Sequence, residues 1–497
     1  MEFVSYKAFG AKGDGKTSDI AAIIAAHAYA NEHSLPVKAE AGAVYYIPYT
    51  ESAAVVCTDT DWTGASFILD DREIPYDKRG GNVFSVESDI PAYHLDSVPA
   101  PKKLQAKLDI TLPEKSMVIL VEEGTMRYRR KGGDANNGSS QRDSVVVDTD
   151  GTVDASAPII WDYQKVTSAL VKPIPSKTLT LRGGTFTTIT ADDIHGRSYY
   201  GRGISITRSD VTVDGLTHFV DNRCPHGAPY SGILQMQNCA YITVKNCTFT
   251  PHLYFRFNLP DGRPYGQGTY DITAGGVVGL TFENCRQTID ILDSRYWGVM
   301  GTNFCKNMVL KECIFSRFDA HQGVANVTIT GCSLGYQGTE VIGLGTVWLE
   351  DTTLHGNAAV ALRPDFGSHW EGDMVIRNCT WIPNNGRPLT RLHPFIGGSN
   401  TEDHDFGYDC TMPHTITIDG LHIDDSRTQE GGGICLIGYM NHLRRDEEYE
   451  AKVAREGYPY QPTGTLKIRN LTTATGRDCI IAANQFMFRN MNVIREA

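Results

Sequence analysis

The sequence lacks the features of three classes of protein. It contains no run of about 18 apolar residues, so we expect no transmembrane helix. Its 46 Lys and Arg are outnumbered by 58 Asp and Glu, and the formal net charge of −12 argues against non-specific nucleic-acid binding. None of its 12 cysteines forms a C-x-x-C pair, which argues against a zinc site of that type. The expected partners therefore include no nucleic acid and no membrane.

Residues 1–5 also lack the basic and apolar segments of a signal peptide. As written, the sequence predicts a cytoplasmic protein, whereas removal of a signal peptide would make it a secreted or periplasmic one. The localisation stays open between these compartments.

The chain does contain a repeated phrase. It reads apolar, any, apolar, any, Asn or Gly, then a small or apolar residue that is often Cys. The alternation has a period of two, so each copy predicts a strand with one buried face. The Asn or Gly predicts a sharp corner, because both tolerate left-handed backbone angles. The copies begin at Leu179, Val211, Ile242, Leu280, Met308, Val327, Val347, Met374, Ile416 and Leu466.

Successive copies lie about 20 to 50 residues apart, which is the period of a solenoid. Strands that recur once per coil stack in parallel, about 4.8 Å apart, and their equivalent residues form ladders. No helical period accompanies the strands, so βαβ units are not expected. We therefore predict an all-β chain that forms a parallel β-helix, with a short N-terminal capping helix and long loops that wall a groove.

The register of the copies predicts two ladders of side chains. The first is an interrupted asparagine ladder that bonds buried turn backbone. The second is a column of cysteines at one interior position, where a repeated small apolar residue indicates core packing and reduced thiols rather than disulfides. The two ladders consist of Asn246, Asn284, Asn378 and Asn470, and of Cys247, Cys285, Cys313, Cys332 and Cys379.

Residues 9–23 read F-G-A-K-G-D-G-K-T-S-D-I-A-A-I, a glycine-rich turn followed by the start of a helix. This segment resembles the opening of the pectate-lyase-like superfamily of right-handed parallel β-helix carbohydrate-active proteins, where F-G-A-x-G-D-G-x-x-D-D-T-x-A-I is common. The sequence departs from that pattern at residues 18–20, Ser-Asp-Ile, where the family often has Asp-Asp-Thr. The resemblance implies a right-handed coil, closed by this segment, and a polysaccharide or oligosaccharide substrate. Because members include lyases, hydrolases, epimerases and phage tailspikes, the resemblance leaves the reaction open.

We predict a single β-helix domain over residues 1–497. Its parts are an N-terminal cap and first coil (1–50), early coils with long insertions (51–175), regular coils (176–475) and a C-terminal cap (476–497). The protein is expected to be a monomer or a homo-oligomer. A basic cluster at residues 127–131 either lines a cleft for an acidic glycan or is a solvated loop.

Titratable and aromatic residues gather between positions 290 and 408, and these are the candidate site residues. Asp293, His321 and Glu340 each lie eight residues after the cysteine of their own copy, which predicts a charged row on neighbouring coils. Arg-x-Asp occurs twice, and because alternate strand residues point the same way, each pair could instead form its own salt bridge. The catalytic candidates are Asp293, Arg295, Tyr296, Arg317, Asp319, His321, Arg363 and Asp365. The substrate-binding candidates are Trp297, Glu340, His369, Trp370, His404 and Tyr408.

Two enzymatic functions and one binding function fit these residues. The preferred one is a polysaccharide lyase acting on a uronic-acid glycan, in which arginines neutralise the uronate, and His321 or Tyr296 acts as base. The alternative is a glycoside hydrolase that uses two carboxylates, about 5–5.5 Å apart for retention or about 6.5–9.5 Å for inversion. The third is a non-catalytic glycan-binding β-helix. No cofactor is expected, although the acidic row could bind Ca²⁺.

Overall fold

The computed structural model describes residues 3–75, 81–132, 137–191, 199–221, 227–258, 262–440 and 458–496. The chain divides into two compact units. The first comprises residues 1–93, 114–117 and 172–301, and the second comprises 94–113, 118–171 and 302–497. Four strands contain residues of both units, namely β8 (Tyr93–His94), β9 (Ser116–Arg127), β11 (Ser168–Pro173) and β24 (Met300–Lys311).

In the first unit, the part of the chain that the structure describes forms one α-helix and many short strands. Its elements are β1 (Val4–Ser5), η1 (Lys7–Phe9), β2 (Asp14–Ser18), α1 (Ile20–His33), β3 (Val37–Lys38), β4 (Val44–Pro48), β5 (Ala54–Val56), β6 (Thr60–Asp70), β7 (Phe84–Val86), β12 (Leu179–Ile189), β13 (Ile204–Ile206), β14 (Val211–Asp214), β15 (Thr217–Asp221), β16 (Leu234–Gln237), β17 (Ala240–Lys245), β18 (Thr248–Phe249), β19 (Phe255–Asn258), β20 (Pro264–Gln267), β21 (Ile272–Gly275), β22 (Val278–Glu283) and β23 (Arg286–Gln287).

The described residues of the second unit form strands and two short 3-10 turns. Its elements are β10 (Ser139–Val147), β25 (Ile314–Thr330), β26 (Ser333–Val341), β27 (Gly343–Glu350), β28 (Thr353–Leu354), β29 (Val360–Leu362), η3 (Pro364–Phe366), β30 (Trp370–Trp381), η4 (Pro383–Gly386), β31 (Leu392–Gly397), β32 (Thr415–Ile423), β33 (Gly433–Ile437), β34 (Thr465–Thr473), β35 (Ile480–Ala482) and β36 (Asn492–Arg495).

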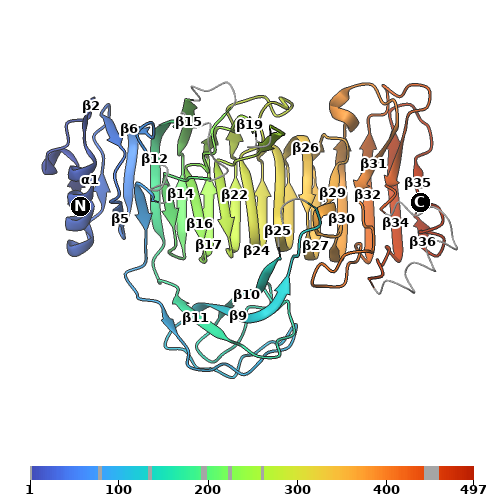
Figure 1. Ribbon diagram of the computed structural model, residues 1–497, viewed down its shortest axis with the longest axis horizontal. Coiled ribbons are helices and arrows are strands. Elements are labelled where there is room, and N and C mark those ends of the chain that lie inside the picture. Colours follow the sequence, from blue (N-terminus) through green and yellow to red (C-terminus); the bar gives the residue numbers. More distant parts are fainter. Residues whose placement is uncertain are drawn as a thin grey trace. The chain divides into compact units, whose positions relative to one another are not determined.

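In the first unit, the repeated strands stack in the predicted register (Figure 1). Val211 of β14 pairs in parallel with Ile242 of β17, which pairs with Leu280 of β22. Two more parallel ladders accompany this one, β13–β16–β21 and β15–β18–β23. A coil therefore contributes a strand to each of three ladders, as in a parallel β-helix; its right-handed sense stays a prediction.

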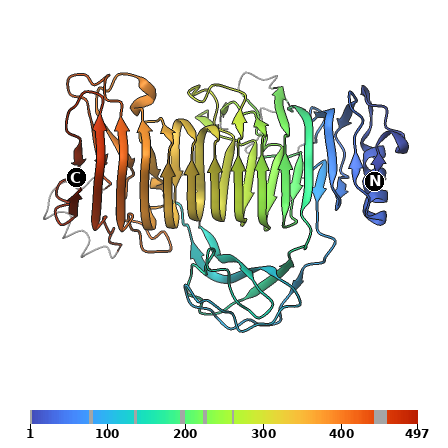
Figure 2. The same cartoon turned by 180° about the vertical axis from the view of Figure 1, so that it is seen from behind.

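The second unit repeats this arrangement. Figure 2 shows its strands as a row of parallel arrows, and the repeated phrase again defines one ladder, β25–β27–β30–β32–β34. A second ladder runs β29–β31–β33–β35. Alternate residues of these strands are buried, which confirms the period-two pattern.

The prediction of a cysteine ladder is confirmed, whereas that of an asparagine ladder is confirmed only in part. The five predicted ladder cysteines are buried and free, as expected. The ladder asparagines do adopt left-handed φ angles of 47–56°. However, their side chains are exposed and do not bond buried turn backbone. The Asn284 amide instead donates to Oδ1 of Asn246 at 2.9 Å. That part of the prediction was wrong because the corner turns the side chain outward.

The helix α1 closes the N-terminal end of the first unit (Figure 1). Its buried residues include Ile23, Ala26 and His27, which pack onto the first coil. Nε2 of His27 lies 2.8 Å from the hydroxyl of Tyr6, and its ring contacts Phe84 edge-on. The predicted capping helix is thus present. No described helix is long and apolar enough to cross a membrane.

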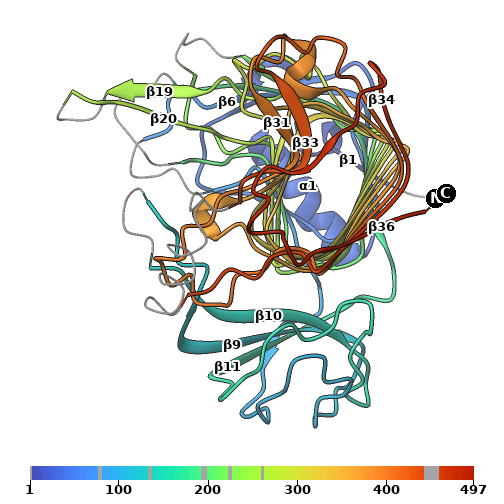
Figure 3. The same cartoon turned by 90° about the vertical axis from the view of Figure 1, so that its right-hand side faces the viewer.

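Residues 94–171 interrupt the coils, and the strands of this region form a separate four-stranded sheet in the order β10-β9-β11-β8 (Figure 3). Within the second unit, a buried ion pair joins this sheet to a coil. Nζ of Lys306 on β24 lies 2.5 Å from Oδ1 of Asp143 on β10, and both side chains are at most 3% exposed. Nζ of Lys306 also donates to the carbonyl oxygen of Pro158.

Candidate functional site

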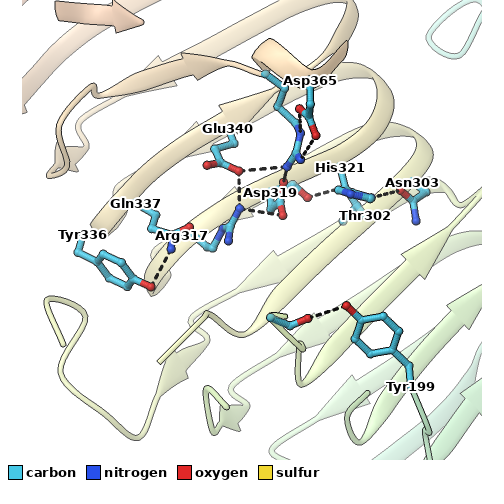
Figure 4. Close-up of polar contacts among 12 residues, drawn as sticks. Tyr199, Thr302, Asn303, Arg317, Asp319, His321, Tyr336, Gln337, Glu340 and Asp365 are labelled. Carbon is cyan, nitrogen blue, oxygen red and sulfur yellow. Dashed lines mark hydrogen bonds and ion pairs between the residues drawn. The ribbon is translucent and has the colours of Figure 1, made fainter. Parts of the chain in front are cut away.

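Five charged residues of the second unit form a continuous network that we call the arginine–carboxylate row. It consists of Arg317, Asp319, Glu340, Arg363 and Asp365, and Figure 4 labels all of these but Arg363. Each Arg-x-Asp pair forms its predicted salt bridge, at 2.9 Å in both cases. The pairs are also joined, because Nη1 of Arg363 lies 2.9 Å from Asp319 and 3.2 Å from Glu340.

A register shift between β25 and β26 decides which residues face each other. Phe315 pairs with Leu334, but Arg317 pairs with Gly338, so β26 has two more residues than β25 over this step. Asp319 therefore pairs with Glu340. The predicted alignment of His321 with Glu340 was wrong, because it assumed coils without a bulge.

The side chains of the row differ in solvent exposure. The side chains of Arg317 and Asp319 are 1% and 0% exposed, whereas Glu340 and Asp365 remain 25% and 20% exposed. Nε of Arg130, which belongs to residues 94–171, hereafter the insert, lies 2.8 Å from Asp365. Together with Arg130, the two arginines of the row face its three carboxylates, so the charges balance.

Burial raises the pKa of the Glu340 carboxyl above its ordinary value, although Arg317 and Arg363 oppose this shift. The negative charge of Asp319 acts in the same direction as burial. A carboxyl with a raised pKa retains its proton closer to neutral pH, so Glu340 is suited to donate a proton.

His321 lies beside the row. Nδ1 lies 3.3 Å from Oδ1 of Asn303, which orients Nδ1 as the donor, and the ring contacts Phe366 edge-on. Burial and the positive charge of Arg363 lower the pKa of His321 to about 4. The ring is therefore neutral at pH 7, with an unprotonated Nε2.

Four of the predicted site residues belong to the first unit. Asp293 and Arg295 form a local ion pair at 2.5 Å, in which Arg295 is 74% exposed. The guanidinium of Arg295 also lies over the ring of Tyr296. Trp297 packs against Tyr254, at 5.1 Å between ring centroids.

The remaining predicted residues differ in accessibility. Trp370 is fully buried, and its indole nitrogen donates to the carbonyl of Gly345 at 3.0 Å, so its prediction as a substrate-binding residue was wrong. The hydroxyl of Tyr408 donates to the carbonyl of Phe366 at 2.8 Å. The ring of His404 packs on Phe406, and its buried Nε2 has no hydrogen-bond partner among the described residues.

His369 and Tyr408 share a cavity of about 400 Å³ that we call the insert cleft. The insert supplies Lys103, Arg127, Ile160, Trp161 and Asp162, and the coils supply His369, Glu371, Tyr408, Asp409, Thr411, His414 and Gln461. All of these residues belong to the second unit. The predicted basic cluster is thus divided: Arg127 lines the cleft, whereas Arg129 and Lys131 form ion pairs with Asp405 and Asp403.

Sequence reasoning missed Lys103, Trp161 and Glu371. The ammonium group of Lys103 forms an ion pair with Glu371, 268 positions away. Lys103 and Trp161 lie within residues 51–175, where long insertions were predicted, but the sequence did not indicate which coil these insertions would contact.

Among the described residues, no group of three or more His, Cys, Asp or Glu side chains is arranged to hold a metal ion. Arginines, rather than a shared cation, occupy the positions between the carboxylates of the row.

No protein-family model and no curated protein matches the chain. Among solved structures, the chain is similar to the tailspike protein gp49 from Pseudomonas phage LKA1, with a TM-score of 0.57, 13% identity, and 99% of this chain and 84% of that chain covered. It also matches tailspike gp61 of Pseudomonas phage phi297, with a TM-score of 0.48, 12% identity, and 95% and 80% covered. The likeness to gp49 supports the β-helix fold, while membership of the pectate-lyase-like superfamily stays a prediction.

Proposed function

We propose that the protein hydrolyses a glycosidic bond, with Glu340 as the proton donor and Asp365 as the carboxylate that activates water. The observation that carries this proposal is that both carboxyl groups contact Arg363, on different nitrogens, and both remain partly exposed. Glycoside hydrolases use two carboxyl groups whose roles are separated by their environments. The choice of a glycan rests on this pair and on the resemblance of residues 9–23.

The two groups have different neighbours. Glu340 has a raised pKa because it is buried beside Asp319, which favours the protonated form. Asp365 is ion-paired with Arg363 and Arg130 at 2.9 and 2.8 Å. Asp319 is fully buried, so we assign it the role of holding Arg317 and Arg363 in place.

The same contacts weaken the preference for β-elimination. A lyase needs a cation that is available to neutralise the uronate, but Arg317 and Arg363 already face three carboxylates. One observation keeps elimination as a second candidate. His321 is neutral and directs Nδ1 toward Asn303, which leaves Nε2 able to accept a proton.

The test is an incubation with a panel of neutral and acidic polysaccharides, followed by reducing ends and by ultraviolet absorbance. We expect new reducing ends without an absorbance rise. Glu340→Gln should then lower kcat by about 10²–10⁴-fold, the usual effect of removing a general acid.

Glu350→Gln is the matched control, because Glu350 is also ion-paired with an arginine and is 30% exposed, but lies outside the row. It should retain activity. A rise in absorbance that depends on His321 would replace hydrolysis by elimination, and equal activity of the two Glu variants would refute the role of Glu340.

A further inference from the structure

The insert cleft is built from groups that can recognise a polar ligand. Its volume of about 400 Å³ lies within the range of small-molecule sites. Nδ1 of His369 accepts a hydrogen bond from the backbone N–H of Thr411 at 3.1 Å, so the proton of the neutral ring lies on Nε2. Among the described residues, none accepts a hydrogen bond from that Nε2, which leaves a donor for a ligand in the cleft.

Arg127 and Trp161 form one wall of the cleft. The guanidinium lies over the indole, 4.6 Å from the ring centroid, and is held by Gln141 at 2.9 and 2.7 Å and by the carbonyl of Gly407. The ring of Trp161 is only half-buried. It therefore offers apolar surface next to charged donors, a combination suited to the C–H and O–H groups of a sugar.

The charges of the cleft argue against an anionic ligand. Lys103 and Arg127 are its cationic residues, but Lys103 is already paired with Glu371. Asp162 and Asp409 add two more carboxylates. A ligand carboxylate would therefore meet an excess of negative charge, whereas uncharged hydroxyl groups can donate to these carboxylates and accept from Arg127 and His369.

We propose that the insert cleft is a binding subsite for an uncharged sugar residue of the glycan. The choice of a sugar rests on the proposed function. One hydrogen bond links the cleft to the arginine–carboxylate row, because Tyr408 lines the cleft and its hydroxyl donates to the carbonyl of Phe366, the residue after Asp365.

The test is saturation-transfer NMR of the intact protein with free monosaccharides. The uncharged probes are glucose, galactose, mannose, rhamnose, fucose, N-acetylglucosamine and N-acetylgalactosamine, and the acidic probes are glucuronic and galacturonic acid. We expect at least one uncharged sugar to receive saturation. Trp161→Ala should weaken that sugar's binding by about threefold to tenfold, the loss expected for one aromatic contact.

Trp348→Ala is the matched control, because Trp348 is also half-buried under an arginine, Arg377, at 5.6 Å. It should bind the sugar normally. Glu371→Gln preserves the shape of the cleft and should also weaken binding, which covers the case in which Trp161→Ala does not fold.

Glu340→Gln separates this proposal from the proposed reaction, because it should lose turnover but keep sugar binding. The proposal is overturned if no uncharged sugar gives a signal that depends on Trp161 or Glu371, or if only the uronic acids do.

Discussion

Replacing Asp319 by Asn should destabilise the second unit far more than an equivalent change at an exposed ion pair. Asp319 is fully buried between Arg317, at 2.9 Å, and Arg363, also at 2.9 Å. Asn would leave these largely buried cations with less neutralising charge. Breaking a buried ion pair in this way costs about 3–5 kcal/mol. At roughly 2 °C for each kcal/mol in a unit of this size, the melting temperature should fall by about 6–10 °C.

The assay is thermal unfolding followed by circular dichroism, with Asp293→Asn as the comparison. Asp293 also pairs with an arginine, but that arginine is 74% exposed, so its loss should cost less than about 1 kcal/mol. The double variant Asp319→Leu/Arg317→Met should recover part of the loss, because it removes charge of both signs. Equal melting temperatures for Asp319→Asn and Asp293→Asn would refute the assignment of Asp319 as the buried centre of the row.

Three further results are expected. Burial lowers the pKa of His27 to about 3, below the unfolded value of about 6.5. The free energy of unfolding should therefore be highest above about pH 6.5 and fall by about 2 kcal/mol between pH 7 and 5. Urea unfolding of His27→Gln should not show this pH dependence. The ring of His321 should titrate near pH 4 by NMR, so a midpoint near 6.5 would contradict the burial of this residue beside Arg363. Lys306→Met should cost about 3–5 kcal/mol by leaving Asp143 buried and unpaired, and adding Asp143→Leu should restore most of the loss in a thermal melt.

The coils could be predicted from the sequence because their signal is local. Apolar residues at alternate positions, followed by a corner residue, specify a strand whether or not its neighbour is known. The pairings of Val211 with Ile242 and of Ile416 with Leu466 follow from aligning the copies. The Arg317–Asp319 salt bridge was predictable for the same reason, since it needs only strand alternation.

The rest depends on contacts between distant segments. The bulge opposite Phe315 has no distinct sequence pattern, so the pairing of Asp319 with Glu340 across β25 and β26 could not be predicted. The insert cleft requires knowing that Lys103 meets Glu371, which only the folded insert decides. Trp370 was misassigned because an aromatic residue that fills the core and one that faces solvent look the same in sequence.

The two extra residues of β26 also indicate which insertions and deletions the coil tolerates between Leu334 and Gly338. Successive residues of a strand point to opposite faces, so an insertion of two residues shifts the charged side chains along the strand but keeps each on the same face. An insertion of one residue would instead have turned Glu340 toward the interior. A library that adds or removes pairs of residues between Leu334 and Gly338 would therefore shift Glu340 along the facing strand in discrete steps while the hydrophobic core stays intact.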